Sequence, residues 1–170
     1  YLRQDIIWHK PNPMPESVRD RCTKSHEYLF LLSKNKKYYY NNEAIKEPVK
    51  QDWGTRDRTM GKYHNPGTGL APHSGLSKSY DRKNKRSVWS ITNKPYKGAH
   101  FAVFPPALIE TCILAGSEQG DIILDPFMGS GTTGMVAKKH FRSYIGCELH
   151  EDYASLQTDR IDSIPPQLVL

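Results

Sequence analysis

The chain has 170 residues, a length that fits one domain with a sizeable core. Its hydrophobic content is only 37% and its mean hydropathy is −0.68, which predicts extensive exposed loop. No apolar run approaches the roughly 20 residues that a helix needs to cross a bilayer, so the sequence excludes a membrane-spanning protein.

The net charge of +6 divides unevenly along the chain. Residues 1–99 contain 20 Lys and Arg against 9 Asp and Glu, whereas residues 100–170 contain 4 against 9. This asymmetry indicates a part that binds a polyanion joined to a part with another role. A solvated basic face explains the charge equally well.

The terminus and the cysteines indicate the protein's setting. The chain starts at Tyr1, without an initiator methionine or a signal peptide, so we expect it to derive from a longer protein. Cys22, Cys112 and Cys147 form neither a disulfide framework nor a zinc spacing. Cys112 and Cys147 lie in apolar segments, where buried thiols are expected. The sequence therefore predicts a cytoplasmic protein without a metal site.

The first 34 residues predict a pair of strands at residues 2–8 and 27–33. A proline-rich loop, Lys10 to Pro15, prevents regular structure between them. The second strand is apolar on both faces, which suits the interior of a sheet covered by helices. From Lys34 to about Gly98 no period survives, and a loop this long is typically functional or disordered.

Regular structure returns at Pro105. Two adjacent prolines suit a helix start, and Gly116 suits its end. The segments that follow predict a strand at 121–125, a helix from the turn at 129–134 to about His140, a strand at 143–147 and a helix at 150–161. This order indicates an α/β protein with a parallel, doubly wound sheet.

The turn Gly129-Ser-Gly131-Thr-Thr-Gly134 places backbone N–H groups at the positive end of a helix, where a ligand can approach closely. Glu148 ends the next strand, 19 residues after Gly129, a position suited to accept hydrogen bonds from ribose hydroxyls. The pattern therefore predicts a nucleoside ligand. The same glycines also match the dinucleotide-binding fingerprint.

The flanking residues decide between these ligands. Asp125 and Pro126 directly follow the strand, where they would repel and crowd a pyrophosphate but suit a cationic amino-acid group. Phe127 is free to lie against a base. The string Asp125-Pro-Phe-Met-Gly-Ser-Gly-Thr-Thr133 resembles motif I of the amino-methyltransferases that act on DNA.

This resemblance covers nearly the whole chain. Further matching segments are Ser143–Leu149 with Tyr153 (ribose binding), His100–Pro105 (around the methionine end of the cofactor), and Trp8–Pro15 with His26–Phe30 (a strand pair). Arg86-Ser-Val-Trp89 before Lys94 is typical of one bacterial and phage branch. Many relatives have a Thr and a Lys in the segment before motif I, and this chain has neither.

The order of the segments is the family's permuted order, with target recognition in the middle and the cofactor motif last. The family's catalytic tetrapeptide, Asp, Ser or Asn followed by Pro-Pro and an aromatic residue, is missing. Pro105-Pro106 follows Phe104 and Pro165-Pro166 follows Ile164, so neither pair fits. We expect the motif upstream of Tyr1.

The resemblance implies a Rossmann-like methyltransferase fold, as a partial doubly wound sheet with a long irregular basic insertion. It implies a site-specific DNA methyltransferase, as a fragment or split part, that transfers a methyl group from S-adenosylmethionine to adenine N6 or cytosine N4. The target nucleotide would be flipped out of the duplex. A bacterial or phage restriction–modification setting near the nucleoid follows, with double-stranded DNA as partner and a missing N-terminal half, a second subunit or a second copy as further partners.

We expect three regions, namely a strand pair of the catalytic half (1–34), a target-recognition insertion (35–98) and a cofactor-binding half (99–170). The expected cofactor-binding residues are Asp125, Pro126, Phe127, Gly129, Ser130, Gly131, Thr132, Thr133, Glu148, His100, Phe101, Phe104 and Pro105. The expected DNA-binding residues are His9, Lys10, Asn12, Lys78, Arg82, Lys83, Lys85, Arg86, Trp89 and Lys94.

Simpler interpretations stand beside these roles. Phe127 could pack in the core, Glu148 could be a surface acid, and His100 could be structural. A turn built for its prolines explains His9, Lys10 and Asn12 nearly as well. At the level of the protein, the alternatives are a non-catalytic module of the same fold and a nicotinamide-dependent dehydrogenase, for which too few residues follow the turn.

Overall fold

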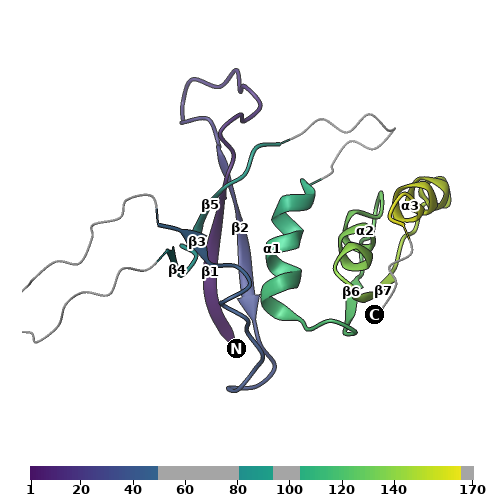
Figure 1. Cartoon of the computed structure of the whole chain (residues 1–170). Helices are drawn as coiled ribbons and strands as arrows, with labels where there is room; N and C mark the ends of the chain where they lie inside the picture. Colours follow the sequence, from purple (N-terminus) through teal and green to yellow (C-terminus); the bar gives the residue numbers. More distant parts are fainter. Residues whose placement is uncertain (50–80, 94–103, 166–170) are drawn as a thin grey trace, which may run out of the picture. The chain divides into compact units, whose positions relative to one another are not determined.

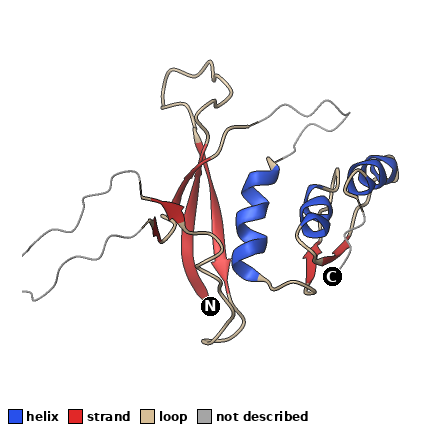
Figure 2. Cartoon of the chain, viewed as in Figure 1, coloured by secondary structure: helices blue, strands red, loops and turns tan. Residues whose placement is uncertain are grey.

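The computed structural model describes residues 1–49, 81–93 and 104–165. The chain divides into two compact units, Tyr1–Ile45 with Arg86–Leu170, and Lys46–Lys85. Figure 1 labels the helices and strands in chain order, and Figure 2 separates helices from strands by colour.

The first unit contains a three-stranded sheet built from β1 (Leu2–His9), β2 (His26–Leu32) and β5 (Val88–Ser90). The strand order is β2-β1-β5, and β1 pairs antiparallel with β2 and parallel with β5. The predicted strand pair is therefore confirmed. The third strand, β5, lies in the region that showed no period.

One face of this sheet packs against α1 (Pro106–Gly116). Ile6 and Trp8 of β1, Trp89 of β5 and Leu108 of α1 form the buried cluster. The Trp8 indole N–H donates to the Ile91 carbonyl at 2.8 Å, and that of Trp89 to the Arg86 carbonyl at 2.7 Å. Both rings are thus buried with their polar atom satisfied, which is the usual condition for tryptophan in a core.

The predicted strand–turn–helix–strand–helix order after Gly116 is confirmed. β6 (Ile122–Asp125) and β7 (Ser143–Gly146) pair in parallel, and α2 (Thr132–Lys139) connects them and packs on them. α3 (Tyr153–Asp162) begins three residues later than predicted and packs on α2 through Ile161. Two parallel strands joined by a helix form the β-α-β unit from which the predicted doubly wound sheet is built.

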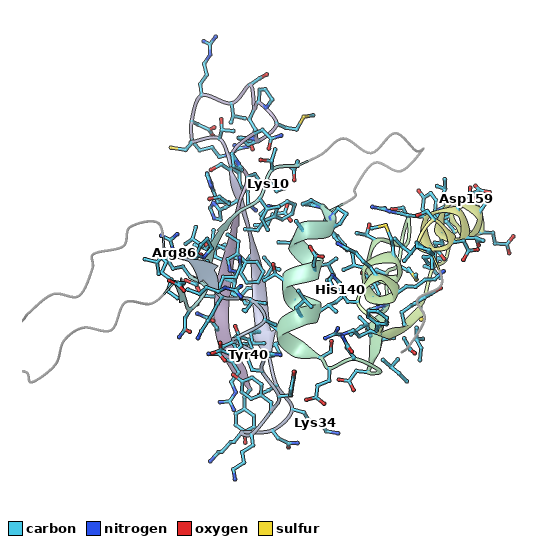
Figure 3. All side chains as sticks on the ribbon, in the orientation of Figure 1. Lys10, Lys34, Tyr40, Arg86, His140 and Asp159 are labelled. Carbon is cyan, nitrogen blue, oxygen red and sulfur yellow. The ribbon has the colours of Figure 1, made fainter. Side chains whose placement is uncertain are left out.

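A second buried cluster joins α1 to α2. Ile113 of α1 contacts Val136 and Ala137 of α2, with Ile123 of β6 against them. Polar contacts at the edge of this interface come from Glu110, whose Oε1 accepts from the Lys139 ammonium at 2.8 Å and lies 2.6 Å from the His140 Nε2. Figure 3 labels His140 at the end of α2. The two helices are therefore held by apolar packing and by charge.

The second unit contains β3 (Glu47–Pro48) and β4 (Arg82–Lys83), which pair antiparallel. The sequence predicted a target-recognition insertion at 35–98, and this role stays a prediction. The structure groups residues 35–45 and 86–93 with the first unit, where Ile45 and Trp89 are buried. Short segments flanked by basic residues carry too weak a pattern for the sequence to mark them as core.

Three further predictions from the sequence can be compared with the structure. Cys112 is largely buried, and burial raises the pKa of its thiol to about 11, whereas Cys147 is exposed, contrary to prediction. β2 is not covered on both faces, because Tyr28, Phe30 and Leu32 are exposed. Within the described residues no helix is long and apolar enough to cross a membrane.

Candidate cofactor site and nucleic-acid interface

The carboxylate of Asp125 closes the turn that follows β6. Its Oδ1 accepts from the Phe127 backbone N–H at 3.0 Å, and its Oδ2 accepts from the Thr133 hydroxyl at 2.5 Å. Asp125 is thus fixed at the strand end from both sides of the glycine turn. Each carboxylate oxygen has two lone pairs, so each retains one for a ligand.

The turn depends on glycine at two positions. Gly129 (φ 50°) and Gly131 (φ 78°) adopt left-handed backbone conformations that side chains disfavour. A Cβ at Gly131 would also stand 3.2 Å from the Cα of Gln157 in α3. The turn is held from that helix, because the Gln157 amide donates to the Gly129 carbonyl at 2.8 Å and Arg160 donates to the Ser130 hydroxyl at 2.7 Å.

Met128 fills the space beneath the turn. It is buried, and its backbone N–H donates to the Cys147 carbonyl at 2.9 Å. A Cβ at Gly146 would stand 1.6 Å from the Met128 sulfur, and one at Gly134 would stand 2.6 Å from its terminal methyl. Gly146 therefore lets Met128 support the turn from the neighbouring strand.

Glu148 reaches the glycine turn, as its spacing predicted. Its Oε2 accepts from the Gly129 N–H at 2.8 Å, and its Oε1 accepts from the N–H groups of Leu149 and His150, both at 2.9 Å. The bond from His150, followed by those from Gly129 and Leu149, lowers the pKa of Glu148. An exposed, ionised carboxylate thus stands beside the turn with one lone pair, on Oε2, left to accept from a hydroxyl.

The remaining predicted residues of the turn differ in how much of each is exposed to solvent. Phe127 is 85% exposed, so it is not a core residue and its ring is open to a ligand. Ser130, Thr132 and Thr133 are buried. Thr132 and Thr133 form the first turn of α2, where their backbone N–H groups point toward the glycine turn.

The segment before α1 is described only in part. Phe104 packs against the cluster of Ile6, Trp8, Trp89 and Leu108, and Pro105 is buried, so the side chain of Phe104 contributes to the core. His100 and Phe101 lie outside the described residues.

At the end of β1, residues predicted to contact DNA already have partners within the protein. The Lys10 ammonium pairs with Glu27 and lies 4.6 Å from the centre of the Trp8 ring. The His9 Nδ1 lies 3.1 Å from the Ser90 hydroxyl. Figure 3 labels Lys10 where the strand passes into the proline-rich loop.

Asn12 binds the chain just after β5. Its amide donates to the Asn93 carbonyl at 3.1 Å and accepts from the Asn93 N–H at 3.1 Å. The Oδ1 atom of Asn93 itself is buried and accepts no hydrogen bond in the described structure. Sequence reasoning missed Asn93, as it missed Gly146, Gln157 and Arg160, because no local pattern marks a residue whose partner is distant in the chain.

Four predicted DNA-binding residues lie at the C-terminal end of the second unit or directly after it. Arg82 donates to the Lys46 carbonyl at 2.6 Å, and Lys83 pairs with Glu47 at 3.6 Å. Lys85 and Arg86 follow them. Trp89 is only 6% exposed and packs in the core, and its contact with DNA stays a prediction. Lys78 and Lys94 lie outside the described residues.

The sequence was compared with models of protein families. Residues 1–159 match a family described as DNA methylase, whose name specifies N6 and N4 methyltransferases. The chain belongs to this DNA methylase family. The suspected resemblance of the glycine turn and its flanking segments is thereby confirmed.

Curated relatives of this methylase chain are type II methyltransferases. The chain is 52% identical over 161 residues to M.SmaI of Serratia marcescens and 45% identical to M.XycI of Xanthomonas campestris pv. cyanopsidis. These matches cover 95% of the chain but 46% and 44% of the relatives. The chain therefore spans about half the length of the curated relatives it matches.

Solved structures show the same fold. The complex of M1.HpyAVI with SAM superposes with a TM-score of 0.59 at 27% identity, covering 94% of this chain and 61% of that one. The PvuII cytosine-N4-specific DNA methyltransferase superposes at 0.66 with 19% identity, covering 97% and 53%. The methylase chain thus has the Rossmann-like α/β fold of the SAM-dependent methyltransferases.

Within the described residues, no group of three or more His, Cys, Asp and Glu side chains is arranged to hold a metal ion. The clustered functional groups are instead the two carboxylates at the glycine turn.

Proposed function

We propose that this chain forms the S-adenosylmethionine-binding part of a site-specific DNA methyltransferase that modifies adenine N6 or cytosine N4. The observation that carries the proposal is that Asp125, at the end of β6, and Glu148, just after β7, both hydrogen-bond to the same glycine turn. Membership of the DNA methylase family supports it.

The residues of the turn fit the chemical groups of this cofactor. Asp125 retains lone pairs for the ammonium of the methionine part, and Glu148 retains one, on Oε2, for a ribose hydroxyl. The exposed ring of Phe127 offers a surface for the adenine. The left-handed glycines leave the backbone open to close approach.

S-adenosylmethionine supplies an activated methyl group on its sulfonium. The chain's own residues orient the donor, because the strand ends and α3 hold the turn rigidly on both sides. Holding two reactants in line is a large part of the rate enhancement in such a transfer. The groups that grip the target amine would come from the catalytic tetrapeptide, which these 170 residues do not contain.

DNA is the proposed substrate. The proposed target-recognition region is 35–98, and the unit Lys46–Lys85 with Arg86 directly after it forms its central part. Lys and Arg there would contact phosphates, which position a protein on DNA without reading sequence. His9, Lys10 and Asn12 are proposed near the target nucleotide, with Asn12 acting by holding the loop against Asn93. The proposed setting is the cytoplasm of a bacterium or phage-infected cell, alongside a restriction partner.

The absence of the catalytic tetrapeptide from these 170 residues favours a second candidate for this chain by itself, a DNA- or cofactor-binding module without catalysis. The two functions differ in a methyl-transfer assay with labelled S-adenosylmethionine, before and after the remaining half of a relative is added. Transfer that appears on addition supports the enzyme.

Titration calorimetry with S-adenosylhomocysteine tests the proposed cofactor site. Asp125→Ala and Glu148→Ala should each weaken binding about tenfold or more, since each removes charge-assisted hydrogen bonds to the ligand. The matched control is Asp159→Ala, an exposed acid on α3, which Figure 3 labels. Heat from NAD, with none from S-adenosylhomocysteine, would contradict the proposal.

A further inference from the structure

Helix α3 contacts the glycine turn through two side chains. Gln157 and Arg160 are three residues apart and so lie on the same side of the helix. The Gln157 amide donates to the Gly129 carbonyl at 2.8 Å, and Arg160 donates to the Ser130 hydroxyl at 2.7 Å. α3 therefore holds two consecutive residues of the turn.

The stem of Gln157 lies directly against the turn. A Cβ at Gly131 would stand 3.2 Å from the Gln157 Cα and 3.4 Å from both its Cβ and its Cγ. α3 is also fixed at its far end, because Lys138 of α2 donates to the Ile161 carbonyl at 3.1 Å. The Gln157 amide is therefore presented to the turn from a helix that is itself held in place.

Gly129 is bound on both sides of its Cα atom. Its N–H donates to the Glu148 carboxylate, and its C=O accepts from the Gln157 amide. These two hydrogen bonds hold Gly129 in the left-handed conformation (φ 50°) that the turn requires. They also fix the orientation of the peptide group that joins Gly129 to Ser130.

The Gly129–Ser130 peptide group carries the Ser130 N–H on the side opposite to its carbonyl. Within the described residues this N–H donates to no protein acceptor. A hydrogen bond to the carbonyl of a peptide group polarises the group and strengthens its N–H as a donor. The Ser130 hydroxyl accepts from Arg160 and keeps its own proton to donate. Gln157 thus leaves a strengthened and oriented donor at the turn.

We propose that Gln157 is a positioning residue of the cofactor site, which orients the Gly129–Ser130 peptide group so that the Ser130 N–H donates to bound S-adenosylmethionine. Gln157 acts through the turn, and Arg160 supports it at the next residue. The inference rests on the proposed function. It adds a residue of α3, outside both the glycine turn and the strand ends, that determines the affinity for the cofactor.

Titration calorimetry with S-adenosylhomocysteine on the full chain tests the proposal through Gln157→Glu. The introduced carboxyl group has the same length as the amide, but in its ionised form it cannot donate to the Gly129 carbonyl. The dissociation constant at about pH 7.5 should rise at least about tenfold over that of the unmodified chain, because the donor is lost and two oxygens then face each other.

The pH dependence of Gln157→Glu separates positioning from packing. A protonated carboxyl group regains an O–H donor, and an ordinary Glu titrates at about 4.3. Lowering the pH from about 7.5 to about 5 should therefore at least halve the ratio of the variant's dissociation constant to that of the unmodified chain. Arg160 keeps its charge throughout, and comparison at equal pH cancels the titration of Asp125 and Glu148. A ratio that stays constant over this range would overturn the proposal, since packing alone would then explain the loss.

Two further variants supply a second test and a control. Gln157→Met keeps the stem against Gly131 but has no donor, so it should weaken binding about threefold to tenfold, with a ratio that does not change with pH. Gln119→Glu adds the same charge at an exposed site just before β6, at the opposite end of that strand from the turn, and should leave binding unchanged. Thermal unfolding of each variant checks folding, and Gln157→Met decides should Gln157→Glu not fold.

Failure of this inference differs from failure of the proposed function. If Gln157→Met and Gln157→Glu bind S-adenosylhomocysteine as tightly as the unmodified chain does, the inference is overturned and the cofactor site stands. An unmodified chain that binds no S-adenosylhomocysteine would overturn the proposed function, and the inference with it.

Discussion

At the scale of single residues, the site depends on which glycines leave room for their neighbours. Gly146 is neither in the turn nor in a left-handed conformation, yet a Cβ there would meet the sulfur of Met128 at 1.6 Å. Met128 is buried under the turn and cannot move outward without disturbing Gly129 and Gly131 on either side of Ser130. The position of the turn therefore depends on Gly146, in the neighbouring strand β7.

We expect Gly146→Ala to destabilise the chain by about 1–3 kcal/mol, the usual cost of overpacking a filled site. Gly116→Ala is the control, because a Cβ at Gly116 meets nothing within 4 Å and alanine favours the helix, so stability should be unchanged or rise by up to about 1 kcal/mol. Urea unfolding of both variants measures the difference. Equal stabilities would show that Met128 rearranges freely.

At the scale of elements, the sequence predicted most of what the hydrophobic pattern marks. Both N-terminal strands, the helix beginning at Pro106 and the strand–turn–helix after it were all predicted, because their apolar residues recur at the period of the element. Glu148 was assigned to the ligand site because it ends the next strand, 19 residues after Gly129. That assignment needs only the spacing of residues along the sequence.

Other features of the structure depend on tertiary contacts, which the spacing of residues along the sequence does not reveal. β5 is three residues long and follows a run of basic residues, so only its pairing with β1 reveals it. The cations around Trp89 predict a DNA contact for it, and only the folded structure shows that its ring packs in the cluster with Trp8. Gln157 and Arg160 hold the glycine turn from a helix whose position depends on tertiary packing.

The contact between α1 and α2 should depend on pH through Glu110. Its hydrogen bond from Lys139, and then that from His140, lower the pKa of Glu110 below the ordinary value of 4.5. A lowered pKa in the folded state means that ionised Glu110 stabilises the fold above about 4.5, and that this contribution declines as pH falls through the lowered pKa.

Accordingly, Glu110→Gln should lower Tm at pH 7, and the gap from the unmodified chain should close as the pH is brought below about 4. Glu151→Gln, at an exposed acid before α3, is the control and should give a small, pH-independent difference. Thermal unfolding followed from neutral to strongly acidic pH measures both. A gap for Glu110→Gln that stays constant over this range would refute the assignment.

At the scale of the whole molecule, charge separates two roles. The basic first 99 residues carry the charge that the proposed DNA binding requires, and the acidic remainder carries the two carboxylates of the proposed cofactor site. Binding to DNA should weaken steeply with salt, because each neutralised phosphate releases counterions. Replacing Arg82, Lys83, Lys85 and Arg86 together with Gln should flatten that dependence, with a log–log slope smaller by up to roughly 0.9 for each phosphate that is no longer neutralised.

Fluorescence anisotropy with a labelled duplex, repeated over a range of salt concentrations, gives this slope. The matched control replaces Lys36 and Lys37, which lie just after β2, and should change the slope less. A slope that is the same for the fourfold variant and the unmodified chain would place the DNA elsewhere.

A crystal structure with S-adenosylhomocysteine tests the central claim most directly. The account predicts the ligand over the glycine turn, with its amino group hydrogen-bonded to Asp125, its ribose hydroxyls to Glu148 and its adenine against Phe127. A ligand bound away from these three residues, or a turn filled by the protein's own side chains while the ligand lies elsewhere, would contradict it.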